Sequence, residues 1–409
     1  MKKPVHASQT QFQVQDNCLL VGGIPLTRLA QRVGSTPFFA YDRALLRSRV
    51  AHLRAVLPAE IRLHYSIKAN PMPALVQLMA GLVDGLDVAS GGELKIALDT
   101  GVQPQHISFA GPGKTDAELA QAIAAHALIH LESESELERV NRLALAMGVN
   151  PKVVVRVNPA FELKSSGMKM GGGAKQFGID AEAVPAMLQK MAELTMDFHG
   201  FQIFCGSQNL KPEAIVEAQS SIFQLAIELA RHAPQPVRLL NIGGGFGIPY
   251  FPGELALDLD PIAANLRQWL PKLALALPKA VVAIELGRYL VGEAGIYVAK
   301  VIDRKISRGQ VFLVTDGGMH HHLAASGNLG QVIRKNYPVA VGNKMSGTER
   351  EIASVVGPLC TPLDLLADQM ELEATKVGDL IVVFQSGAYG MTASPNDFLG
   401  HAKAVEVLV

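Results

Sequence analysis

Cysteine and net charge are both scarce in this sequence, and each shortage excludes a class of protein. The three cysteines, Cys18, Cys205 and Cys360, are far apart and odd in number, which excludes a disulfide framework and gives no metal-ligand spacing. The 37 basic residues equal the 37 acidic residues, so no overall field favours nucleic acid or an anionic membrane. A small-molecule substrate and a reducing, cytoplasmic environment are therefore expected.

Long apolar runs are missing as well. No run reaches 18 apolar residues, and residues 1–15 lack the apolar segment of a signal peptide. The sequence thus predicts a protein that is neither exported nor embedded in a membrane.

The one histidine cluster, residues 320–322, cannot place three imidazoles on one metal if it is extended, because adjacent side chains point to opposite faces. No metal site is predicted.

Apolar residues, by contrast, make up 49% of the 409 residues, which is enough for two or three domains unless one of them is a barrel. Eight strand-like apolar runs alternate with helical segments, at 61–67, 82–88, 106–110, 127–131, 152–157, 198–205, 237–242 and 280–286. Eight such units over about 250 residues predict a parallel (β/α)8 barrel with functional residues just after the strands. A rival doubly wound sheet would lead from its first strand into a Gly-rich turn, whereas this run leads into a lysine.

After residue 288 the pattern changes to short β-branched runs separated by Gly, Asp and Pro. This pattern predicts a mostly β C-terminal domain of the Greek-key or sandwich type. We therefore predict an α/β protein with a barrel at 36–288 and a β domain at 289–409. Residues 1–35 form an extended lead-in that is expected to join the β domain.

Lys68 follows the first run of the barrel. The run ends at Asn70-Pro71, which puts Lys68 at the carboxyl end of the strand, where a pocket opens in a barrel. A lysine amine attacks carbonyl groups in its neutral form, which partial burial favours, and this is the chemistry of a Schiff base with pyridoxal phosphate (PLP). The alternative is an ordinary strand-end lysine that reaches solvent.

Two further motifs follow the seventh and eighth runs. Gly243–Gly245 form a glycine triplet whose backbone N–H groups can converge on an anion, and barrel enzymes often bind phosphate at this place. Alternatively, the glycines serve only the turn. Glu285 closes the eighth run, where a buried carboxylate needs a partner, either the protonated pyridine nitrogen of PLP or Arg288. A carboxylate that keeps the ring protonated suits the loss of carbon dioxide.

Two C-terminal segments, 357–364 and 384–390, contain Cys360 and Tyr389. A free cysteine is usually a small buried hydrophobe rather than a catalyst. A tyrosine between glycine-rich turns serves packing or donates to a phosphate. Neither residue indicates a function by itself.

Seven motifs in this order resemble the alanine-racemase-like (fold type III) PLP enzymes, and among them the decarboxylases of diaminopimelate, ornithine and related amino acids. The motifs are Tyr65–Asn70, Asp87–Glu93, Gly206–Gln208, Gly243–Gly245, Glu285–Arg288, Gly357–Cys360 and Gly387–Tyr389. They span nearly the whole chain. The resemblance implies a PLP-binding barrel with a β domain, in a homodimer whose subunits share their active sites.

The resemblance also implies a role for each matching residue. Lys68 would hold PLP as an aldimine, Asp87 would orient Lys68, and Glu285 would pair with the pyridine nitrogen. Cys360 of one subunit would complete the site of the other and protonate the carbanion left by decarboxylation. The residues implied to bind phosphate or the substrate carboxylate are Ser207, Gly244, Gly245, Arg288 and Tyr389.

Three departures from the family concern the substrate. Phe204 stands where the family has a histidine stacked on the cofactor ring, so stacking is kept without the imidazole. Thr361 replaces the acidic residue that reads a distal amine, and 319–325 contains no counterpart of the arginine for a distal carboxylate. Neither diaminopimelate nor ornithine is the expected substrate. These departures resemble the decarboxylase subgroup encoded beside exosortase and exopolysaccharide systems.

Residues 162–176 fall where the family has a mobile loop. As a lid, this segment would bring Lys164, Lys169 and Lys175 to an anionic or carrier-bound substrate, and the alternative is a solvated loop. The sequence thus predicts a PLP-dependent decarboxylase of an amino acid that is free or tethered to a carrier. An amino-acid racemase or epimerase, which loses a proton instead of carbon dioxide, and a non-catalytic PLP-binding protein are the alternatives.

Overall fold

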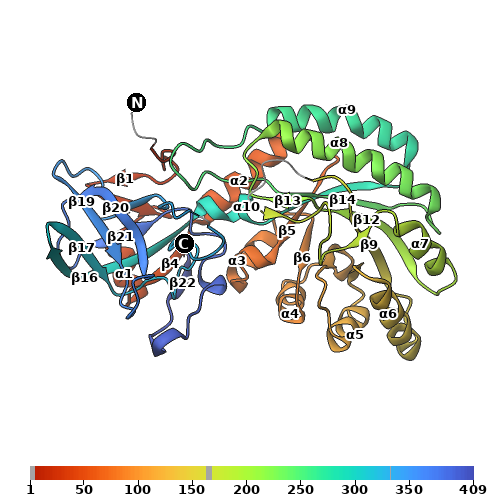
Figure 1. Ribbon diagram of the computed structural model, residues 1–409, viewed down its shortest axis with the longest axis horizontal. Helices are drawn as coiled ribbons and strands as arrows, with labels where there is room; N and C mark the ends of the chain where they lie inside the picture. Colours follow the sequence, from red (N-terminus) through yellow and green to blue (C-terminus); the bar gives the residue numbers. More distant parts are fainter. Residues whose placement is uncertain (1–4, 163–167, 332) are drawn as a thin grey trace. The chain divides into compact units, whose positions relative to one another are not determined.

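The computed structural model describes residues 5–162, 168–331 and 333–409, which fold into two compact units (Figure 1). The barrel unit consists of Val50–Ile248 and Leu257–Gly287. The β-rich unit consists of the residues up to Arg49, Pro249–Ala256 and Arg288–Val409. The helix α2 (Arg43–Val56) begins in the β-rich unit and ends in the barrel unit.

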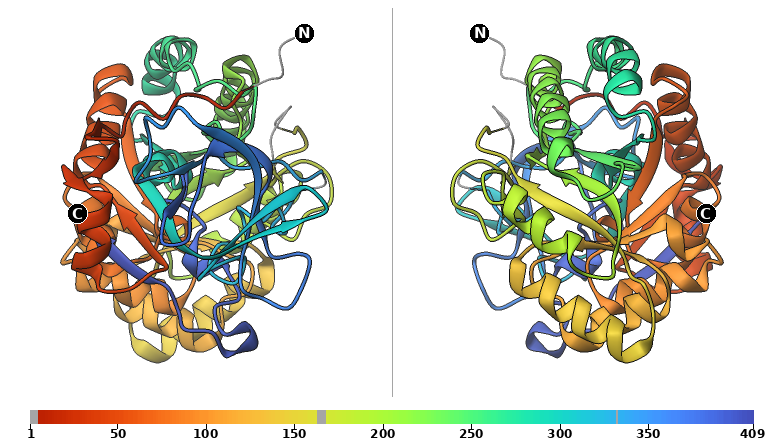
Figure 2. Two further views of the ribbon diagram at one scale, coloured as in Figure 1. Left: turned by 90° about the vertical axis from the view of Figure 1, so that its left-hand side faces the viewer. Right: turned by 90° about the vertical axis from the view of Figure 1, so that its right-hand side faces the viewer.

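Eight parallel strands form the wall of the barrel unit. They are β5 (Arg62–Ser66), β6 (Gly85–Val88), β7 (Ile107–Phe109), β8 (Leu128–Leu131), β9 (Lys152–Asn158), β12 (Asp197–Ile203), β14 (Leu239–Gly244) and β15 (Val281–Leu286). Each strand pairs with two of the others, and β15 closes the ring on β5, so the sheet has no free edge. The right-hand view of Figure 2 shows helices around these strands. The predicted (β/α)8 barrel is therefore confirmed.

Three of the barrel-unit helices begin at residues whose side chains cap them. The helices of this unit are α3 (Pro73–Ala80), α4 (Gly91–Asp99), α5 (Asp116–Ala124), α6 (Glu134–Met147), α7 (Val184–Ala192), α8 (Pro212–Leu229) and α9 (Asp260–Ala276). Ser90, Thr115 and Ser133 cap α4, α5 and α6, because each side chain accepts a hydrogen bond from the N–H three residues later. The caps fix the strand-to-helix connections, which carry the candidate site.

The β-rich unit contains one large mixed sheet with the strand order β18, β21, β16, β17, β19, β20. Their bounds are Val339–Val341, Leu380–Val383, Gly295–Ser307, Gln310–Thr315, Arg350–Val356 and Leu365–Glu373. A further strand, β4 (Phe38–Tyr41), pairs with β16 and with β22 (Val405–Leu408). The predicted barrel boundary at residue 36 thus differs from the unit boundary, because the fully buried β4 pairs with strands of the β-rich unit. The mostly β character of the C-terminal region is confirmed.

The lead-in also belongs to the β-rich unit. Its strands β1 (Val14–Gln15), β2 (Cys18–Val21) and β3 (Ile24–Pro25) form a small antiparallel sheet before α1 (Leu26–Val33). Leu19 of this segment shares one apolar core with Phe38 and Ile296 of the large sheet. Across the described residues of both units, no helix is long and apolar enough to cross a membrane.

Candidate active site

Lys68 lies at the carboxyl ends of the barrel strands. It sits in a one-turn 3-10 helix, η1 (Ile67–Ala69), directly after β5, and the turn closes where the Asn70 N–H donates to the Ile67 carbonyl at 2.9 Å. The lysine lines a hollow of about 250 Å³ together with Asp87 and Glu285. Its side chain is exposed rather than partly buried, so the burial expected from the sequence is not observed.

Glu285 lies on β15, the strand beside β5, and its carboxylate is held by two amides. Gln202 Nε2 and Asn241 Nδ2 both donate to Oε2, the second at 3.1 Å. Burial raises the pKa of Glu285, and the nearby charge of Asp87 raises this pKa further, while Lys68 opposes the shift. Oε1 accepts no hydrogen bond from the described residues. One oxygen of this carboxylate is therefore left for a ligand in the hollow.

Asp87 lies on β6 and is buried, with 5% of its surface exposed. Its Oδ1 accepts a hydrogen bond from Ser108 Oγ and lies 3.5 Å from His64 Nδ1. Its Oδ2 is buried and has no hydrogen-bond partner among the described residues. A buried carboxylate oxygen without a partner is costly, so Asp87 is a second acceptor available to a ligand or to Lys68.

A relay of two side chains that the sequence analysis missed holds Glu285 in place. His130 on β8 is fully buried, and its Nδ1 lies 2.8 Å from Gln202 Oε1. Burial lowers the pKa of His130 to about 4, so the ring is neutral at pH 7. Because an amide oxygen only accepts, Nδ1 carries the proton and donates to Gln202, which turns the Gln202 NH2 group towards Glu285. The signal in the sequence was a polar residue inside each of two apolar runs, His130 in 127–131 and Gln202 in 198–205.

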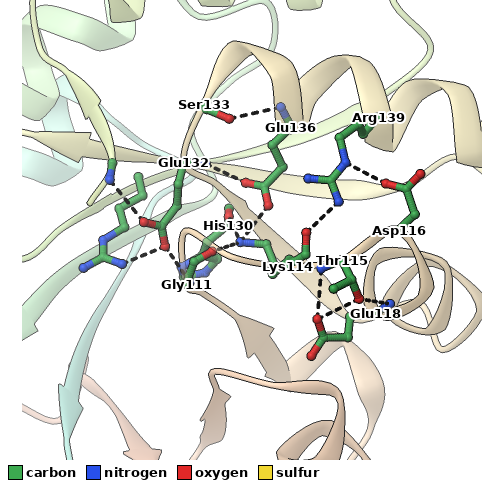
Figure 3. A network of polar contacts seen from close by, with 12 residues as sticks. Gly111, Lys114, Thr115, Asp116, Glu118, His130, Glu132, Ser133, Glu136 and Arg139 are labelled. Atoms are coloured by element: carbon green, nitrogen blue, oxygen red, sulfur yellow. Dashed lines mark hydrogen bonds and ion pairs between the residues drawn. The ribbon is translucent and has the colours of Figure 1, made fainter. Parts of the chain in front are cut away.

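Figure 3 shows a buried charge network, and some of its residues line the same hollow. Lys114 donates to two backbone carbonyl oxygens, at 2.5 and 3.0 Å, and its Nζ lies 3.0 Å from Glu136 Oε1. Arg156 on β9 donates to Glu132 Oε1 at 2.7 Å. Lys114 and Arg156 both line the hollow. Each of the two cations is thus already paired with a buried glutamate, and the network holds both side chains in place beside the hollow.

Replacing Lys114 by methionine is expected to lower the free energy of unfolding by about 3 to 5 kcal/mol, because it leaves the buried Glu136 carboxylate without its cation. Chemical denaturation of the variant measures this loss. Lys190→Met is the matched control, because Lys190 forms its ion pairs, with two glutamates, on the surface, and a much smaller loss is expected there. Equal losses in the two variants would contradict the buried pairing.

The glycine turn packs closely against neighbouring strands. A Cβ on Gly243 would lie 2.5 Å from the Phe204 ring, and a Cβ on Gly244 would lie 2.3 Å from the Glu285 carbonyl oxygen. Gly243 and Gly245 both adopt positive φ, which favours glycine. Phe204 and Gly244 line a separate hollow of about 20 Å³ and not the hollow around Lys68. Ser207 lies in β13 (Gly206–Ser207), paired with β10 (Met168–Lys169).

The remaining predicted site residues belong to the β-rich unit. Arg288 opens α10 (Arg288–Val291), where its Nη1 donates to the Tyr250 hydroxyl at 2.8 Å and its guanidinium carbon lies 4.6 Å from the centre of the Tyr389 ring. The structure thus brings Arg288 and Tyr389 together. Cys360 is an exposed thiol in the turn between β19 and β20.

Part of the predicted lid lies outside the described residues, including Lys164. In the described part, the Gly172 N–H donates to Asn158 Oδ1 at 3.1 Å. Directly after the segment, the Phe177 ring centre lies 4.9 Å from the Arg156 guanidinium carbon. These contacts fasten this part of the segment to β9. The role as a lid stays a prediction.

Comparison with known proteins agrees with this geometry. The family described as "Pyridoxal-dependent decarboxylase, pyridoxal binding domain" matches residues 43–292. The L-glutamyl-[BtrI acyl-carrier protein] decarboxylase of Niallia circulans is 36% identical, over 94% of this chain and 90% of that protein. Diaminopimelate decarboxylase of Aquifex aeolicus is 31% identical, over 97% of this chain and 92% of that protein.

A solved structure shows the same fold. The diaminopimelate decarboxylase from M. jannaschii superposes with a TM-score of 0.89 at 25% identity, over 97% of this chain and 92% of that chain. The residues of the hollow fit the implied cofactor, because they offer an amine at Lys68 and a free oxygen on the half-buried Glu285 for a protonated ring nitrogen. The chain therefore belongs to the pyridoxal-dependent decarboxylases.

Proposed function

We propose that this protein removes, as carbon dioxide, the carboxyl group of an amino acid attached to an acyl-carrier protein, with PLP bound at Lys68. The observation that carries the proposal is the hollow in which Lys68, Asp87 and the half-satisfied Glu285 carboxylate meet. Family membership supports decarboxylation rather than racemisation. The relative of 36% identity acts on a glutamyl group carried by a protein, which supports the tethered substrate.

When it is bound, PLP supplies an electron sink for the electron pair that departing carbon dioxide leaves behind. Lys68 would hold the cofactor carbonyl through its amine. Glu285 would accept a hydrogen bond from the ring nitrogen on Oε1 and keep that nitrogen protonated. Gln202 and Asn241 restrain Glu285 by binding its other oxygen, so the carboxylate needs little reorganisation during the reaction.

The proton that replaces carbon dioxide needs a donor, and we assign that step to Cys360. The thiol is exposed in a turn of the β-rich unit, so it is accessible to another molecule. In the homodimer that we propose, Cys360 of one subunit would reach the site of the other and transfer its proton to the substrate carbon. Arg288 and Tyr389 would bind the phosphate or the substrate carboxylate.

The substrate assignment is tested by carbon dioxide release from three compounds, namely an acyl-carrier protein loaded with L-glutamate, free L-glutamate and diaminopimelate. The carrier-bound substrate is expected to give a kcat/KM at least about tenfold higher than either free amino acid, because binding of the carrier contributes to catalysis. Equal or higher values for a free amino acid would contradict the tethered substrate. No release from any of the three, with the Lys68→Ala protein as blank, would contradict a glutamyl group as the carried substrate.

A further inference from the structure

The barrel unit has a second, larger cavity of about 460 Å³, which we call the lower cavity. Its lining includes the first residues of six strands, namely Arg62, Ile107, Leu128, Lys152, Leu239 and Val281. The hollow around Lys68 is instead lined by residues near or beyond the carboxyl ends of the strands. Because all eight strands are parallel, the lower cavity lies at the opposite end of the barrel from Lys68.

Positive charge predominates around the lower cavity. Arg62, Lys152 and Arg238 line it together with three histidines, and Asp84 is the one carboxylate among the lining residues. Asp84 is already occupied, because it binds Arg54 at 2.6 Å, Arg62 at 3.3 Å and a backbone N–H at 2.7 Å. The half-buried Lys152 amine has no hydrogen bond or ion pair to any residue within the described ranges.

A second carboxylate, Asp197, is also occupied by its neighbours. It accepts a hydrogen bond from Arg238 and lies 2.9 Å from His199 Nε2. Burial lowers the pKa of His199 and the charge of Lys152 lowers it further, although Asp197 opposes both. Burial likewise lowers the pKa of His106, and neighbouring cations add to this effect. The cavity thus holds one cation, Lys152, and one neutral imidazole, His106, without a carboxylate bonded to them in the described residues.

His64 connects the lower cavity with the hollow at the other end. It lines the cavity, only 8% of its surface is exposed, and its Nδ1 lies 3.5 Å from Oδ1 of Asp87, which lines the Lys68 hollow. The charged or titratable groups that face His64 are Asp87, Asp84, Glu285 and His106. Burial lowers the pKa of His64, but Asp87 and the other carboxylates outweigh burial, so that the pKa lies above 6.5.

We propose that the lower cavity binds a small oxyanion of the phosphate or dicarboxylate class, and that this anion acts on the Lys68 hollow through His64 and Asp87. Lys152 supplies the unpaired cation, and Arg62 and the neutral His106 supply further donors. A negative charge beside His64 favours its protonated form, and protonated His64 pairs more tightly with Asp87. The binding step does not depend on the identity of the substrate.

Calorimetric titration of the full-length protein with inorganic phosphate, in the presence of saturating PLP, tests the binding. The same titration with succinate distinguishes a phosphoryl ligand from a dicarboxylate. Saturable binding of at least one of the two is expected, and Lys152→Ala is expected to weaken it about tenfold, the loss of one charge-assisted contact. Lys305→Ala makes the same charge change on an exposed site of β16 and should leave the affinity unchanged. Absence of saturable binding, or equal weakening by both variants, would overturn the site.

Proton NMR of the His64 ring, assigned with the His64→Gln variant, tests the connection to Asp87. Saturating anion is expected to raise the pKa of His64 by at least about 0.5, since an opposite charge within a few ångström favours the charged form. At an anion concentration near the Kd of the parent protein, the rise should be smaller in Lys152→Ala than in the parent. Saturable anion binding that leaves the His64 titration unchanged would overturn the proposed link from the lower cavity to Asp87, but not the anion site.

Discussion

Replacing Lys68 by alanine is expected to lower kcat by at least about 10⁴-fold, because the amine that holds the cofactor carbonyl is lost. Carbon dioxide release on saturating substrate measures this loss. The fold should persist, since Lys68 is exposed and makes no hydrogen bond or ion pair within the described chain. We therefore expect the free energy of unfolding to change by less than about 0.5 kcal/mol.

Lys95→Ala is the matched control for Lys68→Ala. Lys95 is an exposed lysine on α4 of the same barrel unit, so its replacement makes the same chemical change away from the hollow. Its kcat should stay within a factor of about two of the parent, as expected for a surface substitution. A Lys68→Ala protein that kept a tenth of the parent activity would place the cofactor amine elsewhere.

Replacing Glu285 by glutamine is expected to lower kcat by about 10²- to 10³-fold, the size of effect seen when one preorganised electrostatic group is removed. The substitution keeps the volume of the side chain but removes the charge that would stabilise a protonated ring nitrogen. Steady-state decarboxylation gives kcat, and the pH dependence of the cofactor absorbance reports directly on the ring nitrogen. This absorbance change separates an electrostatic role from a merely structural one.

Glu228→Gln makes the same charge change on the exposed surface of α8 and serves as the control. It should leave both kcat and the cofactor spectrum unchanged. If Glu285→Gln retained the parent kcat and spectrum, Glu285 would not face the ring nitrogen. Gln202→Leu provides a second test, because it removes the amide that restrains Glu285, and an intermediate loss of kcat is expected.

The barrel could be predicted from the sequence because each of its strands is a short apolar run, and such runs are typical of a sheet covered by helices. The position of Lys68 followed from the same pattern, since parallel strands carry functional residues at their carboxyl ends. The membership of β4 could not be predicted. Its four residues are as apolar as a barrel strand, and only pairing with β16 assigns them to the β-rich unit.

The relay of His130 and Gln202 also escaped the sequence analysis. The two residues are far apart in sequence and lie on β8 and β12, which are both neighbours of β9. Only the register of these three strands brings the imidazole within 2.8 Å of the amide. Phe204 is a different case, because its motif suggested stacking on the cofactor, whereas its ring lies against Gly243 and lines a separate hollow.

Borohydride reduction of the PLP-loaded protein, followed by peptide mapping, tests the central claim most directly. Reduction makes the bond between the cofactor and its lysine permanent, so the modified peptide identifies the amine that held PLP. We expect loss of the visible absorbance band and a single pyridoxyl group on Lys68. A pyridoxyl group on another lysine, or a protein that acquires no band after addition of PLP, would contradict the assignment of this hollow as the cofactor site.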